Sequence, residues 1–250
     1  AHGLNYIVTG HYARIERDEN TGRYLLKKGV DEGKDQSYVL YNLTQHQLAH
    51  TIFPLGAYSK TQIREMAEKQ SFCNARKHDS QDICFVPDGD YVGFMEQYTG
   101  KRYPSGDFID ENGKKIGTHA GAVRYTIGQR RGLGLPMGDR VYVCAKDMEK
   151  NTVTVGPVES LFATRVIVRD MNWISVPGLT GEMRVKAKLR YRQKEQPAVA
   201  SPLDGGRILL TFDEPQRGPA IGQAAVLYDG DTVVGGGTIC GVPKDGEVCR

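Results

Sequence analysis

The segment with the most chemical promise surrounds one cysteine, Cys84, in Asp79-Ser80-Gln81-Asp82-Ile83-Cys84-Phe85. A thiol attacks as its thiolate, and the cationic run Arg76-Lys77-His78 just upstream favours that form. A cysteine between Ile83 and Phe85 equally fits a buried side chain that acts as a small hydrophobe. Local chemistry therefore leaves two readings open, a nucleophile and a structural core residue.

A row of cations marks a second segment, residues 184–192, where basic and apolar residues alternate. Residues two apart on a β-strand lie on one face, about 6.7 Å from each other. Such a row matches the spacing of an extended polyanion, and mutual repulsion weighs against an ordinary solvated face. We therefore predict a strand that faces RNA on one side and a barrel core on the other. The cations are Arg184, Lys186, Lys188, Arg190 and Arg192.

Two shorter groups carry weaker signals. Gly10 and His11 follow a predicted buried strand, and the carboxyl ends of such strands bind ligands in α/β folds. Glycine permits a close approach of backbone to phosphate, whereas a lone histidine is more often a structural hydrogen-bonding group. Asp35, in Lys34-Asp35-Gln36, fits a helix N-cap. The sequence shows no persuasive second carboxylate, metal-spaced histidine cluster or Ser-His-Asp arrangement.

The elements that must position these residues begin with an α/β pattern. A strand ends at residues 9–11, and an extended pair at 12–16 and 23–27 flanks turn-forming residues. Helices are predicted at 35–43 and 44–51, and another begins at Ser59, which has capping-box spacing to Gln62. Because a parallel strand needs neighbours joined by crossovers, we expect the chain to lack an N-terminal portion.

Later segments change in character. A short helix is predicted at 91–97, and Asn112-Gly113 predicts a hairpin. The glycine-rich basic stretch 125–134 is either a set of turns with solvated arginines or an RNA-facing loop. Short strands then recur, which predicts a small barrel or sandwich. They are residues 164–169, 184–192, 207–213, 224–228 and 232–235. We predict domains at 1–87, 88–165 and 166–250.

Bulk properties narrow the function classes. The 250 residues carry a formal net charge of +3, too small to identify a nucleic-acid binder unless its distribution is considered. No apolar run approaches the roughly 20 residues of a membrane span, and no secretion signal is recognisable. The odd set of five cysteines without a C-x-x-C pair argues against a zinc site or a disulfide framework and favours the cytoplasm. These are Cys73, Cys84, Cys144, Cys240 and Cys249.

Six motifs, in order along the chain, closely resemble those of the tRNA-specific 2-thiouridylases. The resemblance implies an α/β region followed by mostly β structure: the C-terminal remnant of a PP-loop (Rossmann-like) ATPase domain, a small central domain and a C-terminal β-barrel. The motifs are Thr9-Gly10-His11-Tyr12-Ala13, Lys34-Asp35-Gln36-Ser37-Tyr38, the segment 79–85, the segment 125–134, Arg190-Tyr191-Arg192-Gln193 and Gly235-Gly236-Gly237.

The resemblance also implies a reaction. ATP, with Mg²⁺, would adenylate the C2 oxygen of the wobble uridine in tRNA, and a cysteine persulfide would deliver sulfur to C2. The implied partners are tRNA and a sulfur-relay or cysteine desulfurase donor, with neither DNA nor a membrane. By motif position, Cys84 resembles the persulfide cysteine and Gly10 an ATP-contacting glycine. The implied tRNA contacts are His11, Lys34, Asp35, Gln36, Arg190, Tyr191 and Gln223.

Two family features do not occur in these 250 residues. One is the S-G-G-x-D-S loop, whose backbone N–H groups hold the ATP phosphates. The other is the first catalytic cysteine, in a D-x-x-C-N motif. We therefore expect the parent protein to be the enzyme and this polypeptide by itself to be inactive. The rival readings are a non-catalytic RNA-binding module and a thiol redox protein that uses Cys84.

Overall fold

The computed structural model describes residues 3–73, 75, 86, 89–135 and 140–243. The chain forms two compact units. The first contains Ala1–Lys77, Thr164–Pro215 and Ala220–Arg250, and the second contains His78–Ala163 and Gln216–Pro219. A small α/β beginning is followed by mostly strands, so the predicted fold class is confirmed.

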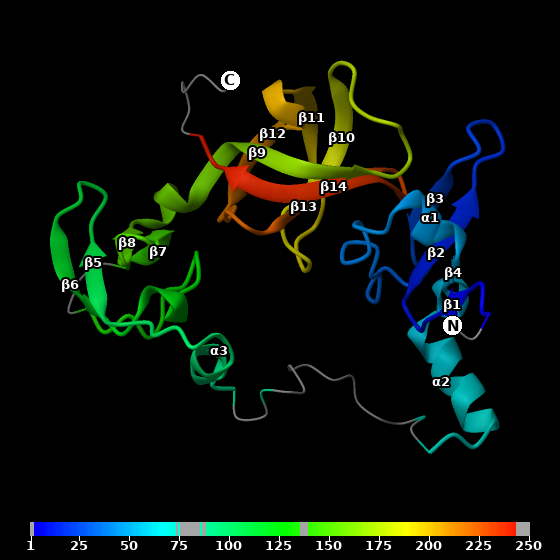
Figure 1. Ribbon diagram of the computed structural model, residues 1–250, viewed down its shortest axis with the longest axis horizontal. Helices are drawn as coiled ribbons and strands as arrows, with labels where there is room; N and C mark the ends of the chain where they lie inside the picture. The colour runs from blue at the N-terminus through cyan, green and yellow to red at the C-terminus, as the bar shows by residue number, and fades with distance from the viewer. Residues whose placement is uncertain (1–2, 74, 76–85, 87–88, 136–139, 244–250) are drawn as a thin grey trace. The chain divides into compact units, whose positions relative to one another are not determined.

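A closed barrel dominates the first unit (Figure 1). In the described residues its strands follow the order β13-β10-β11-β12-β9-β14, and pairing of β13 with β14 closes the ring. Alternation in β10 places Val185 and Ala187 in the barrel core. The strands are β9 (Phe162–Trp173), β10 (Met183–Lys188), β11 (Gln196–Pro202), β12 (Ile208–Arg217), β13 (Ala224–Asp229) and β14 (Thr232–Gly241).

A hairpin from the start of the chain extends this sheet. It consists of β2 (Ala13–Arg17) and β3 (Tyr24–Lys28), and β3 pairs with β14 at Lys27 and Thr232. The predicted turn between the two strands is present, because Asp18 accepts hydrogen bonds from the Asn20 amide and the Thr21 hydroxyl. The start of the chain and the barrel therefore share one sheet, as Figure 1 shows.

The remaining elements of this segment lie beyond the hairpin. Strand β1 (Ile7–Val8) pairs in parallel with β4 (Thr51–Ile52), in a sheet of two described strands. Helix α1 (Gln45–Ala49) begins after a Thr44 capping box, and η1 (Pro54–Ala57) follows β4. Helix α2 (Lys60–Lys69) begins at the predicted Ser59–Gln62 capping box. None of the residues of α2 is buried in the described chain.

Two sequence predictions for the first unit are wrong. Residues 35–43 do not form a helix but consecutive turns, with i to i+3 bonds such as Val39 N to Gln36 O. Tertiary packing of this segment outweighs its helical pattern. The predicted strand 184–192 ends at Lys188, and the backbone turns at Arg190. Strand β11, which the sequence reading missed, carries Pro197 and Pro202.

The second unit contains α3 (Tyr91–Thr99) and, among its described residues, a sheet of order β6-β5-β8-β7. The hairpin predicted at Asn112-Gly113 is confirmed. In the stretch 125–134, Tyr125 and Leu133 are buried while Arg130 and Arg131 are exposed, so both readings of this loop stay open. The strands are β5 (Gly106–Ile109), β6 (Lys115–His119), β7 (Tyr142–Asp147) and β8 (Thr152–Gly156), with short helices η2 (Ala122–Arg124) and η3 (Val158–Leu161).

Candidate nucleic-acid interface

The loop of residues 34–43 packs on the barrel, and we call this contact the loop–barrel junction. The Tyr38 hydroxyl donates to the Ala224 carbonyl at 2.9 Å. The Asn172 amide donates to the carbonyls of Tyr41 and Leu43 at 2.7 and 2.9 Å. A Cβ at Gly236 would lie 2.5 Å from Cδ2 of Tyr41, so the ring occupies space that only glycine leaves open. The loop is thus fixed to β13 and β14 by the side chains of Tyr38 and Tyr41, and to β9 by two of its backbone carbonyls.

Asp35 organises this loop from within. Its Oδ1 accepts the amides of Gly29 and Ser37 at 3.0 and 3.1 Å, and its Oδ2 accepts the Ser37 hydroxyl at 2.8 Å. Its backbone carbonyl accepts the Tyr191 hydroxyl at 3.3 Å. The predicted N-cap role is wrong, because no helix begins here. The carboxylate instead holds a turn, and the carbonyl joins that turn to the segment after β10.

Gln36 joins the loop to the predicted ligand edge at Gly10 and His11. The backbone amide of Gln36 donates to the Tyr12 carbonyl, and the side-chain Oε1 of Gln36 accepts from the backbone amide of Tyr12, both at 2.9 Å. His11 lies one residue before Tyr12, with Nδ1 2.9 Å from the Thr9 hydroxyl and its ring edge-on to Phe53. Predicted site residues from two segments therefore lie on one hydrogen-bonded framework.

Gly10 itself is exposed at the end of β1. A Cβ at this position would meet only Cδ1 of Leu55, at the ordinary contact distance of 3.5 Å. Steric demand therefore does not explain this glycine. The described residues around it supply no observation that fits an ATP phosphate, so we derive no step through ATP from the geometry.

The aromatic and cationic side chains of the junction lie close together. Nζ of Lys188 is 5.7 Å from the ring centroid of Tyr38 and 6.0 Å from that of Tyr191. Burial raises the pKa of Tyr38 to about 12 and also raises that of Tyr191. Both hydroxyls are therefore protonated donors at neutral pH. The Tyr191 side chain is exposed, so an aromatic face beside a cation is available to a ligand.

The five-cation face predicted for 184–192 needs correction. Only Arg184, Lys186 and Lys188 lie on β10, and both terminal guanidinium nitrogens of Arg184 donate to Asp213. Burial lowers the pKa of Lys188, while Asp35 and Glu195 act in the opposite direction. Two of the strand's cations thus face carboxylates of neighbouring segments. The alternation of the sequence correctly predicted which β10 residues point away from the barrel core, but it could not show these carboxylate partners.

For the remaining predicted site residues the structure describes fewer contacts. In the turn after β10, the Arg190 carbonyl accepts a hydrogen bond from the Gln193 backbone amide. The positive charge of Arg190 acts to lower the pKa of Tyr38, against the larger effect of burial. Gln223 is exposed and directly precedes Ala224, whose carbonyl accepts the hydrogen bond from the Tyr38 hydroxyl. Cys84 lies outside the described residues. Ser37 and Tyr38 belong to the junction but were not predicted as site residues, although both belong to a motif that was noted. Lys188, also at the junction, was predicted as one of the cations of the RNA-facing row.

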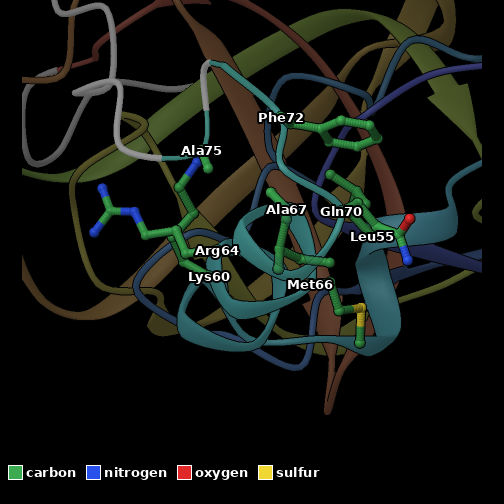
Figure 2. Close-up of a pocket in the computed structure, with 9 residues that line it drawn as sticks. Leu55, Lys60, Arg64, Met66, Ala67, Gln70, Phe72 and Ala75 are labelled. Atoms are coloured by element: carbon green, nitrogen blue, oxygen red, sulfur yellow. The ribbon is translucent and has the colours of Figure 1, made fainter.

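A groove of about 390 Å³ lies apart from these residues, between η1, α2 and the segment after α2 (Figure 2). Phe72 and Ala75 come from the segment after the helix, Met66 and Ala67 come from α2, and Gln70 is the C-cap of α2. None of the predicted site residues that the structure describes lines it. The lining residues are Leu55, Lys60, Ile63, Arg64, Met66, Ala67, Gln70, Phe72 and Ala75.

Two further surveys of the described residues bear on function. No group of three or more His, Cys, Asp or Glu side chains in that part of the chain is arranged to hold a metal ion. No helix within it is long and apolar enough to cross a membrane. Among the described cysteines, burial raises the pKa of Cys144 to about 11, which keeps this thiol unreactive.

Three family models match consecutive parts of the chain. The tRNA methyl transferase HUP domain matches residues 1–88, and the tRNA methyl transferase PRC-barrel domain matches residues 92–157. The aminomethyltransferase β-barrel domain matches residues 163–239. Together these models follow the α/β beginning, the central region and the barrel.

Curated relatives match over nearly the whole chain. A tRNA-specific 2-thiouridylase of Thermoanaerobacter sp. (strain X514) is 51% identical over 94% of this chain and 64% of its own length. That of Heliobacterium modesticaldum is 50% identical over 95% of this chain and 62% of its own length. For Clostridioides difficile the values are 47%, 95% and 66%. The chain thus spans under two thirds of these relatives' length, and it belongs to the tRNA-specific 2-thiouridylase family.

Proposed function

We propose that this protein binds tRNA at the loop–barrel junction as part of the 2-thiolation of the wobble uridine. One observation carries the binding proposal. Residues 34–36 and residues 190–191 are far apart in sequence, yet the Tyr191 hydroxyl lies 3.3 Å from the Asp35 carbonyl. An exposed aromatic ring beside cations is the combination that binds unpaired nucleotides. The 47–51% identity to proteins named for tRNA 2-thiolation supports the same substrate.

The proposed chemistry assigns Cys84 as the carrier of a persulfide. A cysteine desulfurase or sulfur-relay protein would load its terminal sulfur, which would then attack C2 of the uridine. ATP, with Mg²⁺, would supply the adenylyl group that makes the C2 oxygen a leaving group. A further thiol, from outside these 250 residues, is needed to take Cys84 into a disulfide as the sulfur departs. Arg76 and Lys77 would favour the ionised form of Cys84.

A labelling experiment tests the sulfur step. The chain is incubated with a cysteine desulfurase and labelled cysteine, and bound sulfur is mapped by non-reducing peptide mass spectrometry. We expect label at Cys84, none in Cys84→Ser, and unchanged label in the matched control Cys144→Ser. At pH 8 only about one in a thousand Cys144 thiols is ionised when the pKa is about 11. Label spread equally over the cysteines would contradict this assignment.

A binding experiment tests the RNA step. The affinity for an unmodified tRNA transcript is measured between 50 and 300 mM salt for the unchanged chain and for the Arg190→Ala, Arg192→Ala double variant. Each lost phosphate contact lowers the slope of log K against log salt by roughly 0.7 to 0.9. Arg169→Ala is the matched control, because Arg169 is an exposed β9 arginine whose Nε lies 3.3 Å from Asp170. Equal slopes for all three proteins would contradict RNA binding at the junction.

The two rival functions give different results in these experiments. A non-catalytic RNA-binding module would bind tRNA but accept no sulfur at Cys84. A thiol redox protein would react at Cys84 but show no salt-dependent tRNA affinity. We also propose that the 250-residue polypeptide by itself releases no pyrophosphate from ATP, since its sequence contains no S-G-G-x-D-S loop. Robust ATP cleavage would contradict that part of the proposal.

A further inference from the structure

A chain of hydroxyl groups runs from β13 to the loop, within the hydrophobic cluster that the barrel shares with the N-terminal segment. Tyr228 is fully buried in β13, and its hydroxyl lies 3.2 Å from the Ser37 hydroxyl. Ser37 is also fully buried and donates its single proton to Oδ2 of Asp35 at 2.8 Å. Because an ionised carboxylate only accepts hydrogen bonds, Ser37 has no second proton to give. Tyr228 must therefore be the donor to Ser37, and the chain has one direction.

Surrounding groups hold the Tyr228 ring in place. Nζ of Lys28 lies 4.7 Å from the ring centroid and 2.8 Å from both carboxylate oxygens of Glu195. Burial raises the pKa of Tyr228, so the hydroxyl carries its proton at neutral pH. The donor at the inner end of the chain is therefore packed against Lys28 and protonated at neutral pH.

Asp35 transmits this arrangement outward. Its two carboxylate oxygens are directed to Ser37 and Gly29, which sets the orientation of its peptide group. The carbonyl of the same residue receives the hydroxyl of the exposed Tyr191. A buried hydroxyl on β13 is thus connected through two residues of the loop to an exposed aromatic side chain after β10.

We propose that Tyr228 is a positioning residue for RNA binding: through Ser37 and Asp35 it holds the loop and Tyr191 in the arrangement that RNA meets. This inference rests on the proposed function and extends it to a residue with no exposed surface. Tyr228 contacts no RNA itself. Its hydroxyl acts by fixing the Asp35 carbonyl, on which the exposed aromatic ring depends.

Tyr228→Phe tests this role, because it removes one oxygen and keeps the ring against Lys28. We expect about three- to tenfold weaker binding of an unmodified tRNA transcript, the range of one net hydrogen bond. The salt slope should stay unchanged, since no phosphate contact is lost. Tyr24→Phe is the matched control, because Tyr24 packs against the same core cluster. An unchanged affinity in Tyr228→Phe, or an equal loss in Tyr24→Phe, would overturn the inference.

A double-mutant cycle separates positioning from general stability. If Tyr228 acts through Asp35 on Tyr191, the losses of Tyr228→Phe and Tyr191→Phe are less than additive in tRNA affinity. A merely structural role lowers the folded fraction and leaves the affinity of the folded protein unchanged. Additive losses, or a loss that the folded fraction explains entirely, would overturn the inference.

Amide hydrogen exchange gives a readout that needs no RNA. In Tyr228→Phe we expect faster exchange at the Gly29 and Ser37 amides, with unchanged exchange in β12. Unchanged exchange at both amides would overturn the inference even if RNA binding fell. If the unmodified chain bound no tRNA while exchange responded as expected, the proposed function would fail and the hydroxyl chain would stand as a device that holds the loop only.

Discussion

The N-terminal segment of the first unit presents two very different surfaces. At the loop–barrel junction, Ser37 and Tyr228 are fully buried and the polar groups of the loop have hydrogen-bond partners from β9 and β13. Around β1, β4 and α2, which we call the apolar end, Ile7, Val8 and Phe72 expose 61–66% of their surface. One stretch of sequence is therefore fitted to the barrel on one side and leaves apolar surface open on the other. The contrast shows where its stability resides.

Truncation of a large side chain should separate the two surfaces most clearly. Tyr228→Ala removes a fully buried ring, and we expect a loss of about 3–5 kcal/mol in the free energy of unfolding. Ile7→Ala removes an exposed side chain, and we expect a change within about 0.5 kcal/mol. Urea unfolding followed by fluorescence measures both. Comparable losses would mean that the apolar end is packed in solution and that the contrast is wrong.

A pair of glycines sharpens the comparison. Gly236→Ala would push a methyl group against the Tyr41 ring, and overpacking of this kind costs about 1–3 kcal/mol. Gly10→Ala meets only Leu55 at 3.5 Å, so we expect no loss beyond about 0.5 kcal/mol. Melting temperatures of the two variants at equal protein concentration are the measurement. A more damaging change at Gly10 would reveal a close neighbour there in solution.

A smaller effect is expected where the hairpin meets the barrel. Burial tends to raise the pKa of Asp231, but the Arg14 hydrogen bond and the Lys27 charge outweigh it and hold the pKa below its ordinary 3.8. The stabilisation therefore exists above that pH and is lost as pH falls through the lowered value. For Asp231→Asn we expect a loss under about 1 kcal/mol at pH 7, because the pair is partly exposed.

The control for this variant is its own pH dependence. The difference between Asp231→Asn and the unchanged chain should shrink as the pH of the unfolding experiment falls from 5 towards 3. A difference that grew on acidification would contradict the sign assigned to this carboxylate.

The apolar end should respond in association rather than in stability. Charged residues on an open strand discourage pairing between molecules. We expect Val8→Lys to leave the melting temperature almost unchanged while it lowers the concentration dependence of the sedimentation coefficient. Lys114→Glu, a change at a surface residue of the second unit, is the control. An unchanged association in Val8→Lys would show that the β1 edge does not bind other copies.

The sequence predicted local features well where neighbouring residues decide the structure. The Ser59–Gln62 capping box and the turn after Asp18 formed as expected because their partners lie within four residues. The helix expected at 35–43 failed because Tyr38 and Tyr41 pack on the barrel, far along the chain. No local pattern carries such information.

Strand β11 escaped prediction for a different physical reason. Proline lacks a donor and normally argues against a central strand. Pro197 has a register partner only in β10 and Pro202 only in β12, so each lies where one side of the strand has no paired residue. The two prolines therefore lie near the ends of β11, at positions where only one neighbouring strand is paired. They do not exclude the strand from the sheet.

The candidate site was predicted by its residues but not by its geometry. Motif resemblance named Asp35 and Tyr191, and the structure joins them by a hydrogen bond across 156 positions. The inward use of the Asp35 carboxylate could not be read from the sequence, because it depends on Gly29 and Ser37 folding around it. The assignments of Cys84, Gly10 and the tRNA contacts remain predictions.

The pairing of β3 with β14 has a consequence for the order of events during synthesis. Arg14 and Asp231 meet across 217 positions, so the hairpin leaves the ribosome long before its partner strand exists. At about 5–20 residues per second, that interval lasts roughly 10–40 seconds. During that interval the barrel-facing side of the β2–β3 hairpin is uncovered, and chaperones and proteases have access to it. Pairing of the hairpin with β14 therefore cannot begin until residue 232 has been synthesised.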